Sequence, residues 1–143
     1  MSDQLTFTYE IDGEDFTRAG EASSTVKNKL KMLGVDSDAI RKVAIAMYEG
    51  EINMVIHADG GVASVAIRPG SVEIELRDRG PGIPDLELAM QEGYSTASEQ
   101  ARNLGFGAGM GLPNMKRYAD ELKIETELGV GTTVYMLLHD RPC

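Results

Sequence analysis

Two polar side chains stand four residues apart in an otherwise apolar, helix-like run. The run is VDSDAIRKVAIAMYEGEINMVIHADGG, residues 35–61, and it contains Glu49 and Asn53. Side chains at i and i+4 lie one turn apart on the same helix face. A carboxylate there can accept a proton and an amide oxygen can bind Mg²⁺, or both can be ordinary solvated residues. The apolar neighbours and the mediocre helix propensity of Asn favour a functional role.

Two neighbours of this pair carry expectations of their own. Gly50 costs about 1 kcal/mol relative to Ala in a helix interior, so it needs a packing reason or a functional one. Glu51 lies on a different helix face from Glu49, and we expect it at the surface.

A carboxylate also precedes a turn-forming stretch, DRGPGIPD, at residues 78–85. Gly and Pro punctuate chains at turns, so the stretch predicts the end of a strand followed by a tight turn. A turn does not require the acid, however. A second interpretation puts Asp78 at the floor of a pocket, where Gly80 and Gly82 let a ligand approach closely.

Two further glycine-rich stretches are candidate binding elements. GFGAGMGLPNM, residues 105–115, leads into a predicted helix and has neither the P-loop nor the dinucleotide-binding spacing. Free backbone N–H groups at a helix start form an anion site, although a flexible loop explains the glycines equally well. GVGTTV, residues 129–134, precedes a strand, where Thr132 either binds a heterocycle or is an ordinary strand residue.

The periodicity of the remaining sequence predicts the elements that position these residues. It indicates a strand at 5–12, helices at 21–33 and 35–61, a hairpin at 62–78 turning at Pro69-Gly70, a long loop at 86–111, a helix at 112–122 and a hairpin at 123–139. Grouped rather than alternating elements favour a two-layer α/β sandwich, of the α+β kind, with a mixed or antiparallel sheet covered by helices on one face.

Composition narrows the class of protein. The chain has 143 residues, a net charge of −9 and a pI near 4.7, which argues against a nucleic-acid partner. Its one cysteine, Cys143, suits a reducing compartment. No apolar stretch has the length of a signal core or a membrane span. We therefore expect a single domain, residues 1–143, in the cytoplasm and without a membrane partner.

The order and spacing of these motifs resemble the ATP-binding domains of the GHKL (Bergerat-fold) superfamily. The matching segments are Glu49-x-x-x-Asn53, Asp78-x-Gly80-x-Gly82, a loop ending in Gly109-x-Gly111, and Gly131-Thr132. Within the superfamily, DRGPGIPDLELAMQEGYSTA and GMGLPNMKRYADEL are most similar to the anti-sigma-factor serine/threonine kinases of bacterial partner switching, particularly RsbT-like switch kinases. The resemblance covers roughly residues 36 to 138.

This resemblance implies a role for each matching residue. Asp78 would accept a hydrogen bond from the adenine amino group of ATP, next to Gly80, and Gly82 would leave space for the base. Asn53 would hold Mg²⁺, and Glu49 would be the general base toward a serine or threonine hydroxyl. Residues 86–108 would form the ATP lid. Thr132 would lie on the adenine side, and the phosphates would be bound by the backbone of Gly107, Gly109 and Gly111.

The implied partner is an antagonist protein of the STAS type, with a sigma factor or phosphatase as a further partner and a homodimer as the assembly seen among relatives. Two departures from the switch kinases support an alternative. The lid is longer, and Gly107 replaces an arginine that some of these kinases carry. Arg102, Lys116 or Arg117 could reach the γ-phosphate instead, although each is also explained as an ordinary surface cation. The alternative is a non-catalytic, ATP-gated module that sequesters or activates a partner. A detached histidine-kinase domain is less consistent with the Glu-x-x-x-Asn form.

Overall fold

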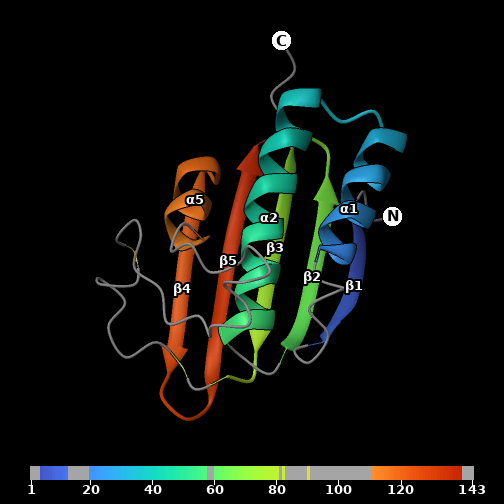
Figure 1. Ribbon diagram of the computed structural model, residues 1–143. Helices are drawn as coiled ribbons and strands as arrows, with labels where there is room; N and C mark the ends of the chain where they lie inside the picture. Colours follow the sequence, from blue (N-terminus) through green and yellow to red (C-terminus); the bar gives the residue numbers. More distant parts are fainter. Residues whose placement is uncertain are drawn as a thin grey trace.

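A computed structural model describes residues 4–12, 20–57, 60–80, 82, 90 and 111–139. These residues form one antiparallel sheet with helices on one of its faces (Figure 1). The elements are β1 (Leu5–Asp12), α1 (Glu21–Met32), α2 (Ser37–His57), β2 (Gly60–Arg68), β3 (Ser71–Asp78), α5 (Gly111–Tyr118), β4 (Glu121–Glu127) and β5 (Gly131–His139). The predicted two-layer α+β architecture is confirmed, and every strand pairing in the described chain is antiparallel.

The sheet has the strand order β1-β2-β3-β5-β4, so β3 and β5 pair at its centre although 52 residues separate Asp78 from Gly131. The end of β3 and the start of β5 therefore lie at the same end of the sheet, where α2 also ends (Figure 1). Both predicted hairpins form, with Pro69-Gly70 between β2 and β3, but they begin two residues earlier than predicted, at Gly60 and Glu121. The predicted helix end at residue 122 is therefore wrong, since α5 ends at Tyr118.

The boundaries of α2 follow local chemistry. Asp36 caps the start, because its Oδ2 accepts hydrogen bonds from the N–H groups of Asp38 at 3.1 Å and Ala39 at 3.4 Å. The predicted helix end at Gly60-Gly61 is wrong. The helix stops at His57, and the two glycines begin β2, where Gly61 pairs with both Ile11 and Asp78. None of the helices in the described ranges is long and apolar enough to cross a membrane.

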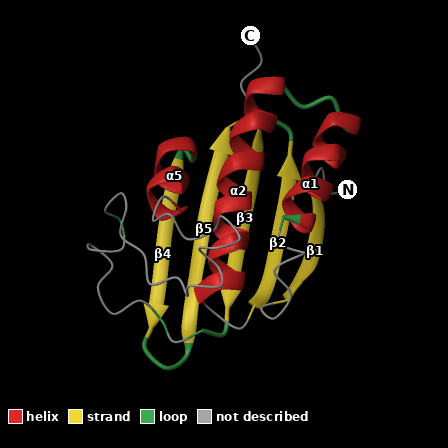
Figure 2. Cartoon of the chain, in the orientation of Figure 1, coloured by secondary structure: helices red, strands yellow, loops and turns green. Residues whose placement is uncertain are grey.

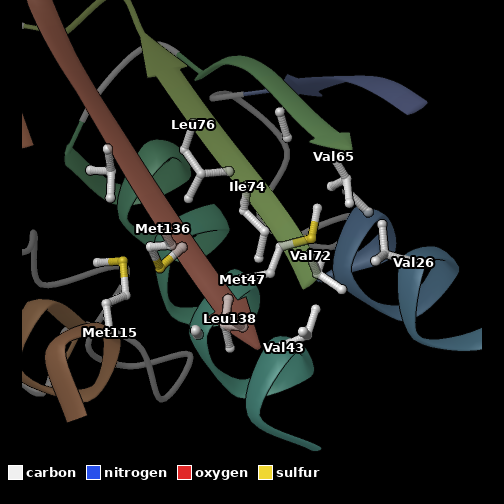
Figure 3. Packing of buried hydrophobic residues seen from close by; sticks show 14 of the residues in the cluster. Val26, Val43, Met47, Val65, Val72, Ile74, Leu76, Met115, Met136 and Leu138 are labelled. Carbon is white, nitrogen blue, oxygen red and sulfur yellow. The ribbon is translucent and has the colours of Figure 1, made fainter. Parts of the chain in front are cut away.

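The hydrophobic core lies between the sheet and α2. Alternate residues of β2, β3 and β5 point toward the helices, as the period of two in a strand requires. Figure 3 shows α2 packed on these strands and flanked by α1 and α5. Its labelled core residues are Val26, Val43, Met47, Val65, Val72, Ile74, Leu76, Met115, Met136 and Leu138.

Gly50 has a packing reason. A Cβ at this position would collide with Cδ1 of Leu76 and would lie 3.3 Å from Sδ of Met115. Leu76 is only 2% exposed and Met115 is fully buried, so neither has free space to move into. The missing side chain therefore lets α2 approach both β3 and α5.

Gly50→Ala is accordingly expected to destabilise the protein, although alanine is the better helix former. Overpacking costs about 1–3 kcal/mol and outweighs the gain in helix propensity of about 1 kcal/mol. Urea unfolding would measure the loss, and Leu76→Val in the same chain, which removes the clashing methyl, should recover part of it. A more stable Gly50→Ala protein would contradict the packing explanation.

Glu51 corrects the sequence prediction, since it is buried rather than at the surface. It is 1% exposed and its carboxylate caps α1. Oε2 accepts hydrogen bonds from the N–H groups of Gly20 at 2.9 Å and Ala22 at 3.2 Å, and Oε1 accepts one from Ser23 at 3.0 Å. Gly20, the N-cap residue, has no side chain to do this. The carboxylate also lies at the positive end of the helix dipole.

Glu51→Gln is expected to lower the free energy of unfolding by about 1–2 kcal/mol. One amide oxygen remains as an acceptor, but the NH₂ group then faces backbone donors that have lost their partner. Thermal melts would measure the change, with the exposed Glu21→Gln in the first turn of α1 as control. Equal melting temperatures for the wild type and Glu51→Gln would show that these bonds do not hold α1.

Candidate functional site

Asp78, the last residue of β3, has a carboxylate held from two directions by the backbone. Its Oδ1 accepts hydrogen bonds from the N–H of Gly80 at 3.0 Å and from the N–H of Thr132 at 2.9 Å. The first bond is local to the turn, whereas the second joins β3 to β5. Within the described chain both bonds fall on the same oxygen, so the carboxylate is oriented while Oδ2 remains available to another donor.

Three glycines allow close backbone packing in this region, and one of them, Gly131, also lies next to the carboxylate. A Cβ at Gly131 would collide with the carbonyl oxygen of Asp78 and would lie 3.3 Å from Oδ1. A Cβ at Gly61 would collide with the carbonyl oxygen of Arg77 and would lie 2.8 Å from Cα of Asp78. Gly82, at a φ of 84°, approaches the carbonyl oxygen of Glu127, the last residue of β4. Sequence reasoning assigned no site role to Gly61, and its only signal was the Gly-Gly pair.

Thr132 is buried beside Asp78 and contributes its backbone to the site. Its N–H is bonded to Asp78, and its hydroxyl shares a 2.9 Å hydrogen bond with the hydroxyl of Thr126 on β4. These two hydrogen bonds of Thr132 therefore connect β5 to β3 on one side and to β4 on the other. Figure 2 shows the turns and strand ends at this end of the sheet.

Glu49 and Asn53 lie one turn apart on α2, and both are partly exposed. Burial raises the pKa of the Glu49 carboxyl, and a hydrogen bond from the side-chain amide of Asn114 opposes that rise. Asn53 is next to Met54, whose Cε lies 2.8 Å from the position of a Cβ on Gly61. Because Gly61 also borders Asp78, this part of α2 lies at the same end of the sheet as the aspartate.

The glycine-rich stretch is described only from Gly111, the first residue of α5. Gly107, Gly109 and Arg102 lie outside the described residues, as does nearly all of the predicted lid. Met90 is its one described residue, and it packs against the hydrophobic core. In the last turn of α5, Lys116 and Arg117 are both exposed.

This arrangement fits a nucleotide with a divalent ion. Asp78 offers an acceptor that is oriented by the N–H of Thr132 and by the close approach of Gly131, and Asn53 offers an amide oxygen. The described residues include no cluster of three or more His, Cys, Asp or Glu side chains suited to a metal. Mg²⁺ does not need one, because it is usually bound by one or two protein oxygens together with phosphates and water.

The fold and these motifs define an ATP-binding domain of the class seen in histidine kinases. Residues 14–138 match the family described as "Histidine kinase-like ATPase domain", and the chain belongs to this family. The chain is 32% identical over 141 residues to the anti-sigma F factor of Geobacillus kaustophilus, covering 94% of this chain and 90% of that protein. It is 30% identical over 141 residues to the anti-sigma F factor of Halalkalibacterium halodurans, with the same coverage.

Two solved structures share the fold at low sequence identity. One contains the RsbU and RsbW domains of a Mycobacterium tuberculosis protein, with a TM-score of 0.65 and 20% identity; the match covers 97% of this chain but 34% of that longer one. The other is the mycobacterial sensor histidine kinase MprB, with a TM-score of 0.53, 19% identity, and coverage of 97% of this chain and 100% of that one.

Proposed function

We propose that this protein is an ATP- and Mg²⁺-dependent serine/threonine protein kinase of the anti-sigma type, acting in the cytoplasm on an antagonist protein of the STAS class. Family membership and the anti-sigma names of its relatives support the class of protein. The observation that carries the proposal is the half-buried Glu49 carboxylate, one turn from Asn53 and on the part of α2 that lies at the same end of the sheet as Asp78.

Each proposed site residue has a distinct task. Oδ2 of Asp78 accepts a hydrogen bond from the adenine amino group, in a site shaped by Gly80, Gly82 and Thr132. The amide oxygen of Asn53 binds Mg²⁺, which offsets the negative charge of the phosphates. The backbone N–H groups at the start of α5 bind phosphate oxygens by the same principle that makes any helix start an anion site. Gly111 is the first residue of α5. We assign the same task to the backbone N–H groups of Gly107 and Gly109, which precede the helix in the sequence.

Glu49 is the proposed general base. As the partner's serine or threonine oxygen bonds to the γ-phosphorus, the bond from that phosphorus to the β,γ-bridging oxygen breaks and ADP leaves. The hydroxyl proton passes to the Glu49 carboxylate. A raised pKa suits this task, because a base with a pKa nearer the working pH holds the proton more readily.

Phosphotransfer to a partner tests the proposal. Labelled ATP and Mg²⁺ would be incubated with the protein and a STAS-domain protein from the same genome, with EDTA as the control. We expect label on a serine or threonine of the partner, and none with EDTA. Tight ATP binding without transfer to any STAS protein of that genome would overturn the kinase assignment. Gel filtration of the protein alone would show whether it forms a homodimer. Gel filtration with a sigma factor or phosphatase, with and without ATP, would test these proteins as further partners.

The alternative function is a nucleotide-gated binding module without phosphotransfer. The absence of an arginine at position 107 favours it, and the candidate cations Lys116 and Arg117 are exposed in the last turn of α5, away from its first residue Gly111. In cells, Glu49→Ala would then leave regulation intact, whereas Asn53→Ala would abolish it. Loss of regulation in both variants would favour the kinase.

A further inference from the structure

Asn114 contacts the proposed general base from a different helix. It is the fourth residue of α5, three positions after Gly111, and it is partly buried. Its side chain lies within hydrogen-bonding reach of the Glu49 carboxyl on α2 and lowers the pKa of that carboxyl. The residues assigned to nucleotide, ion and base do not include Asn114, and sequence reasoning gave it no role.

The packing of the two helices explains how this contact forms. Gly50 has no side chain, so Met115 of α5 packs directly against α2 at that point. Met115 is fully buried, which fixes the face that α5 turns toward α2. Asn114 precedes Met115 and Glu49 precedes Gly50, so both side chains lie beside the point where Met115 packs against α2.

We infer that Asn114 is a positioning residue that fixes the orientation of the Glu49 carboxylate and links it to the start of α5, the helix that follows the glycine-rich loop. The inference rests on the proposed kinase function. A glutamate side chain has several rotamers, and a hydrogen bond to its carboxylate selects among them. The same bond favours the ionised form, in which the base is competent to accept a proton.

The kinetic test uses Asn114→Asp, which keeps the shape of the side chain and replaces the donor with an acceptor. We expect kcat for phosphotransfer to fall by about 10-fold or more, with the KM for ATP within about 2-fold of wild type. Asn114→Gln, which retains an amide, should recover part of the rate. The control is Asn28→Asp, the same change at an exposed position of α1, and its kcat should not change. An unchanged or higher kcat in Asn114→Asp would overturn the inference.

A second readout needs no nucleotide. Melting temperatures of Glu49→Ala, Asn114→Ala and the double variant form a cycle in the free protein. We expect the double variant to lose less than the sum of the single losses, because either change alone already breaks the contact. Strictly additive shifts would overturn the inference.

The two tests separate this inference from the proposed function. A wild type that transfers phosphate, together with an Asn114→Asp variant that transfers equally well, would overturn the positioning role alone. A wild type that transfers no phosphate would overturn the kinase function. If the losses in melting temperature were still non-additive in that case, the contact would be purely structural, and the positioning role would be overturned as well.

Discussion

Glu49→Gln is expected to lower the rate of phosphotransfer by about 100- to 10,000-fold, the range over which a positioned general base contributes. The amide cannot accept a proton, yet it has nearly the same shape and can still accept the hydrogen bond of Asn114 through its oxygen. The dissociation constant for ATP and Mg²⁺ should stay within a few-fold of wild type. Single-turnover transfer and calorimetry would measure the two effects separately.

The raised pKa of Glu49 adds a pH dependence to this prediction. The pKa of the Glu49 carboxyl is raised above the usual glutamate value of 4.5, so on acidification the wild-type rate should begin to fall at a higher pH than that value predicts. Folding favours the protonated form of a group whose pKa burial raises. The contribution of Glu49 to stability is therefore greatest below its unfolded pKa and is lost as the pH rises through its folded pKa.

Stability measurements check the sign of this effect. Above the folded pKa, Glu49→Gln should melt at the same temperature as wild type or at a higher one, and the difference should vanish in acid.

A Glu49→Gln protein that transfers phosphate at the wild-type rate would exclude Glu49 as the base. A variant that binds no ATP would show instead that Glu49 belongs to the binding site.

Asp78→Asn is expected to weaken ATP binding roughly 10- to 150-fold, which corresponds to about 1.5–3 kcal/mol for a hydrogen bond to a charged group. The asparagine oxygen can still accept the N–H groups of Gly80 and Thr132, so the fold should persist. The amide NH₂ then replaces Oδ2 and meets the adenine amino group donor to donor. Guanine has a carbonyl oxygen at that position, so the preference for ATP over GTP should narrow.

Calorimetry with ATP and GTP would measure both affinities in the presence of Mg²⁺. Asp38→Asn is the matched control, because Asp38 is an exposed aspartate at the far end of α2 that pairs with Arg41 and Lys42. It should bind ATP as the wild type does. An Asp78→Asn protein with unchanged affinity for ATP would show that this carboxylate does not contact the base.

Local chemistry was sufficient to predict most of the fold. Alternation in residues 5–12 and 71–78 identified strands, and Pro69-Gly70 identified the turn between β2 and β3. These features depend on side chains within a few residues of each other, so periodicity and turn chemistry reveal them. The glycine-flanked Asp78 stood out for the same reason, because an acid beside turn residues is a local anomaly.

The sequence by itself therefore determined the order of the elements, the family and the segments that carry the candidate site. Only the tertiary structure decided what each of three neighbouring residues of α2 contacts. Glu49 meets Asn114 of α5, Gly50 admits Leu76 and Met115, and Glu51 caps α1 from inside the core. Periodicity indicates which helix face a residue occupies. It does not indicate which distant segment covers that face, because such contacts join residues 26 to 65 positions apart and depend on how the layers pack.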